Sequence, residues 1–260
     1  LHYWEEPCIS GTRGSGAIFF SGCTLRCCFC QNYKISSATY GKEISEQKLA
    51  RIFLELQNQG AHNINLVTAT QYLPSILNAL DLVKNQLKIP VVYNSSGYEK
   101  PETIRLLKGY VDIYLPDLKY FSSELSRKYS KAEDYFEVAS CAIKLMIEQT
   151  GTPVFDSDGM LQKGVIVRHL VLPNCRKDSI SLLHWLKETL PDKQYLISLL
   201  SQYTPFYNSH KYPELNRRIT TYEYESILKE TISLGLVEGF MQEKSSAKEE
   251  YTPPFDLEGL

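Results

Sequence analysis

The sequence lacks the features of exported, membrane-spanning and strongly charged proteins. Its first residues, LHYWEEPCIS, contain no basic segment followed by an apolar one, so they do not resemble a signal peptide. No apolar run approaches the roughly 20 residues that a membrane span needs. The net charge of -2 gives no overall attraction to nucleic acid or to an anionic membrane surface. We therefore expect a cytoplasmic protein with no nucleic-acid partner and no membrane partner.

Two motifs are also missing, and each absence narrows the choice of fold or site. No G-x-G-x-x-G follows the first expected strand, which argues against a dinucleotide-binding fold. No second C-x2-C pair is present to complete a structural zinc site, which usually takes four ligands from two pairs. With 260 residues, 43% of them hydrophobic, the chain can bury the core of a large α/β domain without disulfide bonds.

Helix-like and strand-like segments alternate along the chain. Leu49, Ile52, Phe53 and Leu56 recur on one face of an expected helix over residues 45–59. Further helices are expected over residues 73–87, 100–108, 123–149 with a break near Lys131, 178–191 and 220–234. Strands are expected over residues 17–20, 63–70, 89–97, 111–120, 194–206 and 236–240. A hairpin is expected over residues 153–173. This alternation predicts parallel strands with right-handed crossovers, in either an open doubly wound sheet or a barrel.

Polar residues gather at the C-terminal ends of these expected strands. They are Cys23, Thr68, Asn94, Asp117, Lys119 and Gln202. In a barrel such strand ends converge on one mouth, where active sites are built. No linker interrupts the pattern, so we expect one domain over residues 1–240, followed by a charged and then Pro-rich tail over 241–260.

Seven cysteines are present, and four of them fall within CTLRCCFC, residues 23–30. Clustered thiols in a reducing compartment favour metal binding or catalysis over disulfides, and soft thiolates select zinc or iron–sulfur. Cys23-x3-Cys27-x2-Cys30 supplies three ligands from one loop, whereas Cys28 adjoins Cys27 and is expected to point away. An iron–sulfur cube held by three cysteines leaves one iron open to a substrate or cofactor. A zinc-bearing interaction module is the alternative.

The remaining cysteines carry no such pattern. Cys141 lies on an expected helix and Cys175 in a loop after a strand, and both are interpreted as small buried hydrophobic residues.

With Phe29 in its aromatic position and Gly22 before its first cysteine, this motif resembles the signature of the radical S-adenosylmethionine (radical SAM) superfamily. The wider stretch GSGAIFFSGCTLRCCFCQN is similar to the branch of enzymes that activate pyruvate formate-lyase and its relatives. VVYNSSG, VDIYLPDLKY and GVIVRHLVLPN resemble later strands of that branch. The resemblance covers most of the chain and implies a partial (β/α)6 TIM-like barrel of parallel strands.

The resemblance also implies the chemistry. A [4Fe–4S] cluster is expected on Cys23, Cys27 and Cys30, with S-adenosylmethionine chelating the open iron. One-electron cleavage of the sulfonium would give a 5′-deoxyadenosyl radical that abstracts a hydrogen atom. The expected partners are a glycyl radical enzyme or a peptide substrate, and an electron donor such as flavodoxin or ferredoxin. A small molecule or another peptide side chain is the alternative hydrogen donor.

Cofactor-binding residues follow from the same resemblance. Thr68 opens the segment Thr68-Ala69-Thr70-Gln71, which stands where the branch has a Gly-Gly-Glu turn. Asp117 and Lys119 share one face of an extended segment, and Arg168 has a planar fork suited to the cofactor carboxylate. The other expected cofactor contacts are Asn32, Asn94, Ser96 and Gln202. His169 follows Arg168 on a strand, so it is expected to face the opposite side and to be structural.

Overall fold

The computed structural model describes residues 1–36, 40–242, 255 and 257. Its centre is a sheet with the strand order β1-β2-β3-β4-β6-β7-β8, in which every neighbouring pair is parallel. The bounds are β1 Gly16–Phe19, β2 Ile64–Val67, β3 Val91–Ser95, β4 Ile113–Pro116, β6 Leu161–Leu170, β7 Leu196–Leu200 and β8 Gly239–Met241. The short strand β5, Val154–Phe155, pairs antiparallel with β6. The expected hairpin and the expected parallel strands are therefore confirmed.

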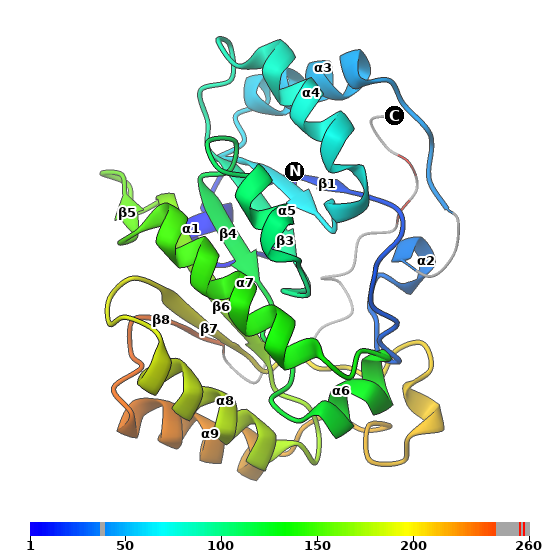
Figure 1. The fold of residues 1–260 in the computed structure, drawn as a ribbon, viewed down its shortest axis with the longest axis vertical. Helices are drawn as coiled ribbons and strands as arrows, with labels where there is room; N and C mark the ends of the chain where they lie inside the picture. The colour runs from blue at the N-terminus through cyan, green and yellow to red at the C-terminus, as the bar shows by residue number, and fades with distance from the viewer. Residues whose placement is uncertain (37–39, 243–254, 256, 258–260) are drawn as a thin grey trace.

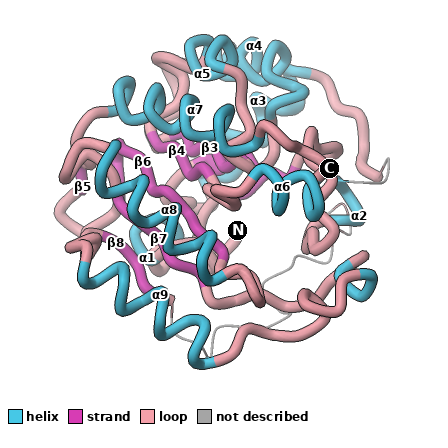
Figure 2. Tube along the Cα trace, turned by 60° about the horizontal axis from the view of Figure 1, so that its bottom comes forward, coloured by secondary structure: helices cyan, strands magenta, loops and turns pink. Residues whose placement is uncertain are grey.

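Helices connect the strands and cover the outer face of the sheet (Figures 1 and 2). The longer ones are α3 Glu46–Asn58, α4 Leu73–Val83, α5 Pro101–Leu106, α6 Ser123–Ser130, α7 Tyr135–Thr150, α8 Arg176–Thr189 and α9 Thr221–Ser233. Short helices lie at α1 Pro7–Ser10 and α2 Tyr33–Ser36. Figure 2 shows the helices in an arc around the strands. The sheet is thus curved and helix-covered, as expected for a partial barrel, and not an open sheet with helices on both faces.

Local sequence signals explain where these helices begin and end. The side chain of Ser45 accepts a hydrogen bond from Lys48 N–H at the start of α3. At the start of α9, Thr220 and Glu223 form a capping box. The expected break near Lys131 is confirmed, because α6 ends at Ser130 and Lys131 takes a left-handed φ of 61°.

Alternate residues of the strands face two different layers. One set packs against the helices and forms the main hydrophobic core: Leu66, Tyr93, Tyr114, Val167 and Ile197. The other set faces the barrel interior: Val92, Ile113, Leu115, Ile166 and Leu196. Cys8 and Ile9 of α1 belong to this second cluster. The N-terminal segment therefore fills the interior of the barrel, a role that sequence analysis did not assign to it.

The C-terminal part of the chain continues one residue beyond the expected boundary at residue 240. β8 extends to Met241, and Gln242 N–H donates to Leu199 O at 3.0 Å. Most of the expected tail, residues 243–254, 256 and 258–260, lies outside the described residues. Within the part of the chain that is described, no helix has the length and apolar character needed to cross a membrane.

Candidate functional site

The cysteine loop leaves β1 and is fixed by main-chain hydrogen bonds to α6. Gly22 takes a φ of 88°, a left-handed conformation that glycine adopts most readily. Further along, Arg26 N–H donates to Ser130 O at 3.1 Å, and Cys28 N–H donates to Tyr129 O at 2.8 Å. The last turn of α6 therefore holds the loop in place through its backbone.

The four cysteines of this loop separate into two groups. Cys23, Cys27 and Cys30 are half-buried, while Cys28 is only 7% exposed and belongs to the main hydrophobic core. Burial raises the pKa of the Cys28 thiol to about 12. The burial of Cys28 agrees with the expectation that it points away, and its exclusion from the ligand set stays a prediction.

The three remaining thiols lie close enough to interact electrostatically. Burial raises the pKa of each, to about 11 for Cys30, and a negative charge on Cys27 raises the pKa of both Cys23 and Cys30 further. Three neighbouring thiolates therefore repel one another unless a cation or a cationic cluster neutralises them. This donor set fits an iron–sulfur cluster, whose irons bind soft thiolates.

The described side chains do not separate a zinc module from an iron–sulfur site. Among residues 1–36, 40–242, 255 and 257, no three His, Cys, Asp or Glu side chains are grouped so as to hold one metal ion. The same result applies to Cys23, Cys27 and Cys30, so their role as cluster ligands stays a prediction.

The other two cysteines behave differently from each other. Cys175 is buried, as expected. Cys141 is exposed, so its interpretation as a buried hydrophobic residue was wrong. On α7 the buried positions include Ala139, Ala142 and Ile143, and position 141 falls on the solvent side of that helical stripe.

Asp117 and Lys119 form an ion pair beside Cys27. Lys119 Nζ lies 2.5 Å from Asp117 Oδ2, and the two side chains are 15% and 30% exposed. Burial alone would lower the pKa of Lys119, but the charges of Asp117 and Cys27 raise it above its ordinary value. Lys119 thus remains a fixed positive charge next to the cysteine loop.

Tyr135 of α7 joins the ends of β3 and β4 and was missed in the sequence. Its hydroxyl accepts a hydrogen bond from Lys119 N–H at 3.0 Å and lies 2.8 Å from both Ser96 O and Asp117 O. Three expected site residues, Ser96, Asp117 and Lys119, are therefore brought together by one buried tyrosine. The chain has 18 tyrosines, and no local sequence pattern distinguishes Tyr135 from the others.

Gly97 permits the close approach of the β3 and β4 ends. It has a φ of 76°, and a Cβ built on it would overlap Asp117 O. We expect Gly97→Ala to lower the free energy of unfolding by about 2–3 kcal/mol, because it adds backbone strain and a clash. Urea unfolding measures this. Gly109→Ala is the matched control: φ is 85° there but nothing lies within 4 Å, so a loss of only about 1 kcal/mol is expected. Equal losses of stability in the two variants would contradict the role of Gly97 in the close approach of the β3 and β4 ends.

The segment Thr68-Ala69-Thr70-Gln71 ties the loops after β1 and β2 together. Thr68 has a left-handed φ of 57°, and its N–H donates to Asn94 O at 2.9 Å. Gln71 Nε2 donates to Ser21 O at 2.7 Å, and lies 3.0 Å from both Gly22 O and Thr68 O. The side chain of Gln71 therefore anchors the start of the cysteine loop, a contact that sequence analysis did not anticipate.

A buried carboxyl group supports the same segment from the helix side. Thr70 Oγ1 donates to Glu99 Oε1 at 2.7 Å and lies 2.9 Å from the hydroxyl of Tyr93. Glu99 is 1% exposed, and its Oε2 has no hydrogen-bond partner among the described residues. Burial raises the pKa of Glu99 from 4.5 to about 7, although the hydrogen bond from Thr70 opposes this. Glu99 therefore titrates near neutrality.

We expect this titration to make stability depend on pH. Between pH 4.5 and about 7 the folded state binds more protons than the unfolded state, so stability falls as pH rises, by about 3 kcal/mol in total. Glu99→Gln keeps the shape without the charge. The variant should be about 2–3 kcal/mol more stable than wild type at pH 8 and nearly equal to it at pH 4.5 by urea unfolding. A wild type that is more stable than Glu99→Gln at pH 8 would contradict the raised pKa of Glu99.

Arg168 and Asn94 face the barrel interior, where both meet the N-terminal segment. Arg168 Nε donates to Glu6 Oε1 at 2.8 Å, and its Nη2 contacts carboxylate oxygens of both Glu5 and Glu6. Asn94 Nδ2 donates to Glu5 Oε1 at 3.2 Å. The carboxylates of Glu5 and Glu6 thus pair with the guanidinium of Arg168, which was expected to pair with a cofactor carboxylate.

His169, next along β6, lies on the opposite face as expected. Its Nδ1 is 2.7 Å from Leu118 O and its Nε2 is 2.8 Å from Ser179 Oγ on α8. Burial lowers its pKa to about 4, so it is a neutral, structural side chain.

Asn32 and Gln202, the two other expected cofactor contacts, lie in loops. Asn32 O accepts hydrogen bonds from Ile35 N–H at 3.1 Å and Ser36 N–H at 2.9 Å, which starts α2 directly after Cys30. Gln202 Oε1 accepts a hydrogen bond from Gln242 Nε2 at 2.9 Å. These contacts give the positions of the two residues, and their cofactor roles stay predictions.

Comparison with known proteins decides the family. A family model described as "Radical SAM superfamily" matches residues 17–157, which include the cysteine loop and the strands β1 to β4. The chain belongs to the radical SAM superfamily. Radical SAM proteins use a [4Fe–4S] cluster and S-adenosylmethionine, so the expected cofactor class is confirmed.

Individual relatives support the fold. An uncharacterized protein of Methanocaldococcus jannaschii, MJ0674, is 33% identical over 240 residues, which are 88% of this chain and 64% of that protein. The chain therefore spans less than two thirds of the relative's length. Streptococcus suis SuiB bound to S-adenosylmethionine has a TM-score of 0.60 at 14% identity over 87% of this chain and 49% of SuiB. Methylornithine synthase, PylB, has a TM-score of 0.57 at 16% identity over 84% of this chain and 60% of PylB.

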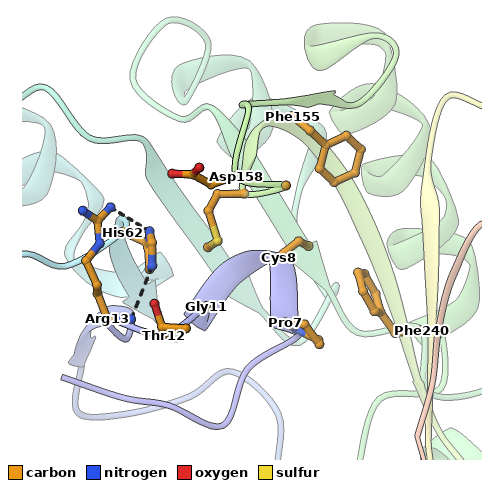
Figure 3. A pocket seen from close by; sticks show the side chains of 11 residues that line it. Pro7, Cys8, Gly11, Thr12, Arg13, His62, Phe155, Asp158 and Phe240 are labelled. Atoms are coloured by element: carbon orange, nitrogen blue, oxygen red, sulfur yellow. Dashed lines mark hydrogen bonds between the residues drawn. The ribbon is translucent and has the colours of Figure 1, made fainter.

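One surface cavity of this radical SAM chain is shown in Figure 3, and none of the expected site residues lines it. It measures about 780 Å³, and its lining comes from α1 and from residues at or before the starts of strands: Pro7, Cys8, Arg13, His62, Met160 and Phe240. Arg13 Nη2 lies 3.0 Å from His62 Nδ1 on one wall. The expected site residues instead lie within or after the C-terminal parts of the strands, the end at which barrel enzymes build their active sites.

Proposed function

We propose that this chain is a radical SAM enzyme that holds a [4Fe–4S] cluster on Cys23, Cys27 and Cys30 and binds S-adenosylmethionine at the C-terminal mouth of the barrel. The observation that carries the proposal is the separation of the four loop cysteines. Three half-buried thiols interact with one another, and Cys28, the only other cysteine of the loop, is buried in the core. Three ligands for four irons leave one iron for the cofactor.

The chain's own residues prepare this mouth in distinct ways. The last turn of α6 and the side chain of Gln71 fix the cysteine loop through its backbone. Lys119 keeps a positive charge beside Cys27, which favours the thiolate form of that ligand. When bound, the cluster and S-adenosylmethionine supply one-electron cleavage to a 5′-deoxyadenosyl radical, which takes a hydrogen atom from the substrate.

Anaerobic reconstitution tests the proposal. The full chain is incubated with iron, sulfide, S-adenosylmethionine and dithionite, and 5′-deoxyadenosine is measured by chromatography. We expect a brown protein that forms 5′-deoxyadenosine. A colourless protein that carries stoichiometric zinc and forms no 5′-deoxyadenosine would contradict the proposal and favour the interaction module.

The finer proposal is that the hydrogen donor is a glycyl radical enzyme. It is supported by the stretch around the cysteines, GSGAIFFSGCTLRCCFCQN, which resembles the activating branch of the superfamily. A flavodoxin or ferredoxin would supply the electron. Mixing the reconstituted chain with a candidate synthase should give a glycyl radical signal in electron paramagnetic resonance, and no signal with any such partner would count against this choice.

A peptide substrate is the second candidate, favoured by tyrosines around the mouth. Tyr33, which follows the cysteine motif, stacks on Tyr207 with ring centroids 5.1 Å apart, and Tyr207 is 40% exposed. Tyr72, after β2, is 43% exposed. Exposed aromatic side chains are common where proteins bind peptides, and SuiB has been solved bound to its precursor peptide SuiA. Deuterium transfer from a labelled peptide into 5′-deoxyadenosine, but not from a synthase, would favour this candidate.

A further inference from the structure

Among the described residues, Cys27 is the one expected ligand whose sulfur has a nearly fully buried hydroxyl donor. Ser130, the last residue of α6, donates from Oγ to Cys27 Sγ at 3.0 Å and is 1% exposed. Ser130 Oγ also lies 2.8 Å from the hydroxyl of Tyr120, which is fully buried. Cys30 Sγ has a hydroxyl neighbour at 3.1 Å in Ser36, but Ser36 is half-buried and can exchange its bond with water.

The direction of these hydrogen bonds follows from counting protons. A thiolate sulfur can only accept, so the single hydroxyl proton of Ser130 points to Cys27 when Cys27 binds metal. The hydroxyl of Tyr120 must then donate to Ser130 Oγ. The result is a buried chain of donors from Tyr120 through Ser130 to Cys27, in surroundings where each bond strengthens the next.

We propose that Ser130 is a positioning residue that raises the reduction potential of the cluster through its hydrogen bond to Cys27. The inference rests on the proposed function, because it requires the cluster to be bound by Cys27. Reduction adds negative charge to the cluster and its sulfur ligands, and a donor aimed at one of these sulfurs stabilises the reduced form. The positive charge of Lys119 acts on the same thiolate and in the same direction.

The experiment is a redox titration of the reconstituted full chain, followed by electron paramagnetic resonance of the reduced cluster. Ser130→Ala removes the donor and leaves the cysteine in place. At a fixed ambient potential we expect the ratio of reduced to oxidised cluster to fall about tenfold, which corresponds to a midpoint about 59 mV lower for a one-electron couple. The hydrogen bond reaches a charged group, which is why its loss should be this large.

Two further variants separate this effect from a loosened helix. Ser126→Ala removes another buried hydroxyl of α6, one that donates to Ser123 O at 3.1 Å and does not contact a cysteine sulfur, so the midpoint should not move. Tyr120→Phe removes the donor to Ser130 but leaves the proton on Ser130, so the midpoint should fall by less than in Ser130→Ala. Iron content of each variant shows that the cluster is retained.

The possible results have distinct meanings. Wild-type midpoints in both Ser130→Ala and Tyr120→Phe would overturn the inference while leaving the proposed function intact. An equal fall in Ser126→Ala would also overturn it, because the shift would then come from a looser α6. If Ser130→Ala loses its cluster, the Tyr120→Phe variant tests the inference alone: a lowered midpoint supports it, and a wild-type midpoint overturns it. A wild-type chain that assembles no cluster would overturn the proposed function itself, and with it this inference.

Discussion

Cys27→Ala is expected to abolish both the cluster and the formation of 5′-deoxyadenosine. The charge of Cys27 raises the pKa of Cys23 and of Cys30, and Ser130 donates a hydrogen bond to its sulfur. Two remaining cysteines cannot hold the cluster, so iron and sulfide content should fall to the background of a preparation without added iron. Activity should drop by at least about three orders of magnitude, to the uncatalysed level.

Cys28→Ala is the matched control, because it removes a thiol from the adjacent position. Cys28 is 7% exposed and packs in the hydrophobic core, so the substitution should cost about 1 kcal/mol of stability and leave iron content and activity unchanged. If Cys28→Ala loses the cluster and Cys27→Ala keeps it, the assignment of ligands is wrong. Circular dichroism of both variants shows whether the barrel has folded.

Arg168→Met is expected to destabilise the fold more than any other substitution considered. The substitution leaves Glu5 and Glu6 without their cation, and their side chains are only 10% and 4% exposed. Removing one partner of a buried ion pair typically costs 3–5 kcal/mol, because the remaining charge stays buried. Urea unfolding at pH 7 measures the loss. Arg105→Ala is the control: Arg105 and Glu102 are 62% and 73% exposed, and a loss below about 1 kcal/mol is expected.

The pH dependence of this effect gives an independent check. Burial alone would raise the pKa of Glu6, but the charge and hydrogen bonds of Arg168 outweigh burial and place the pKa below 4.5. A carboxyl with a lowered pKa contributes stability that is present above pH 4.5 and is lost as the pH falls through the folded-state pKa. The difference between wild type and Arg168→Met should therefore shrink below pH 4.5. A constant difference from pH 7 down to acid would contradict the ion-pair account.

The parallel sheet was predictable because buried strands and amphipathic helices leave strong local patterns. The fully buried strand β2, Ile64–Val67, and the capped helix α3, Glu46–Asn58, show these patterns at their clearest. The proximity of Cys23, Cys27 and Cys30 was predictable for a different reason: the three come from one short segment, which keeps them close together in the fold. The exposure of Cys141 could also have been predicted from the helical stripe of its neighbours.

The N-terminal plug could not be predicted in the same way. Glu5 and Glu6 are charged residues near a chain end, a position that is usually exposed. They are buried because Arg168, 162 positions away from Glu6, faces the barrel interior and needs counter-charges. The sequence shows that an inward-facing arginine requires carboxylates, but it offers 30 acidic residues and no local sign of which ones serve.

The contacts of Tyr135, Gln71 and Glu99 were missed for a related reason. Each connects the ends of two or more strands through a side chain whose neighbours in the sequence carry no matching pattern. Such contacts arise only once the crossovers have brought the strand ends together. These contacts stabilise the arrangement of the strand ends at the mouth of the barrel, whereas the cysteine motif is the part of the sequence that indicates the cofactor.

The most direct test of the account is the Mössbauer spectrum of the anaerobically reconstituted chain, enriched in ⁵⁷Fe, before and after addition of S-adenosylmethionine. Three protein thiolates for four irons predict that one iron site differs from the rest and that this site alone changes when the cofactor is added. A spectrum that shows four equivalent, sulfur-ligated irons and does not respond to S-adenosylmethionine would contradict the account.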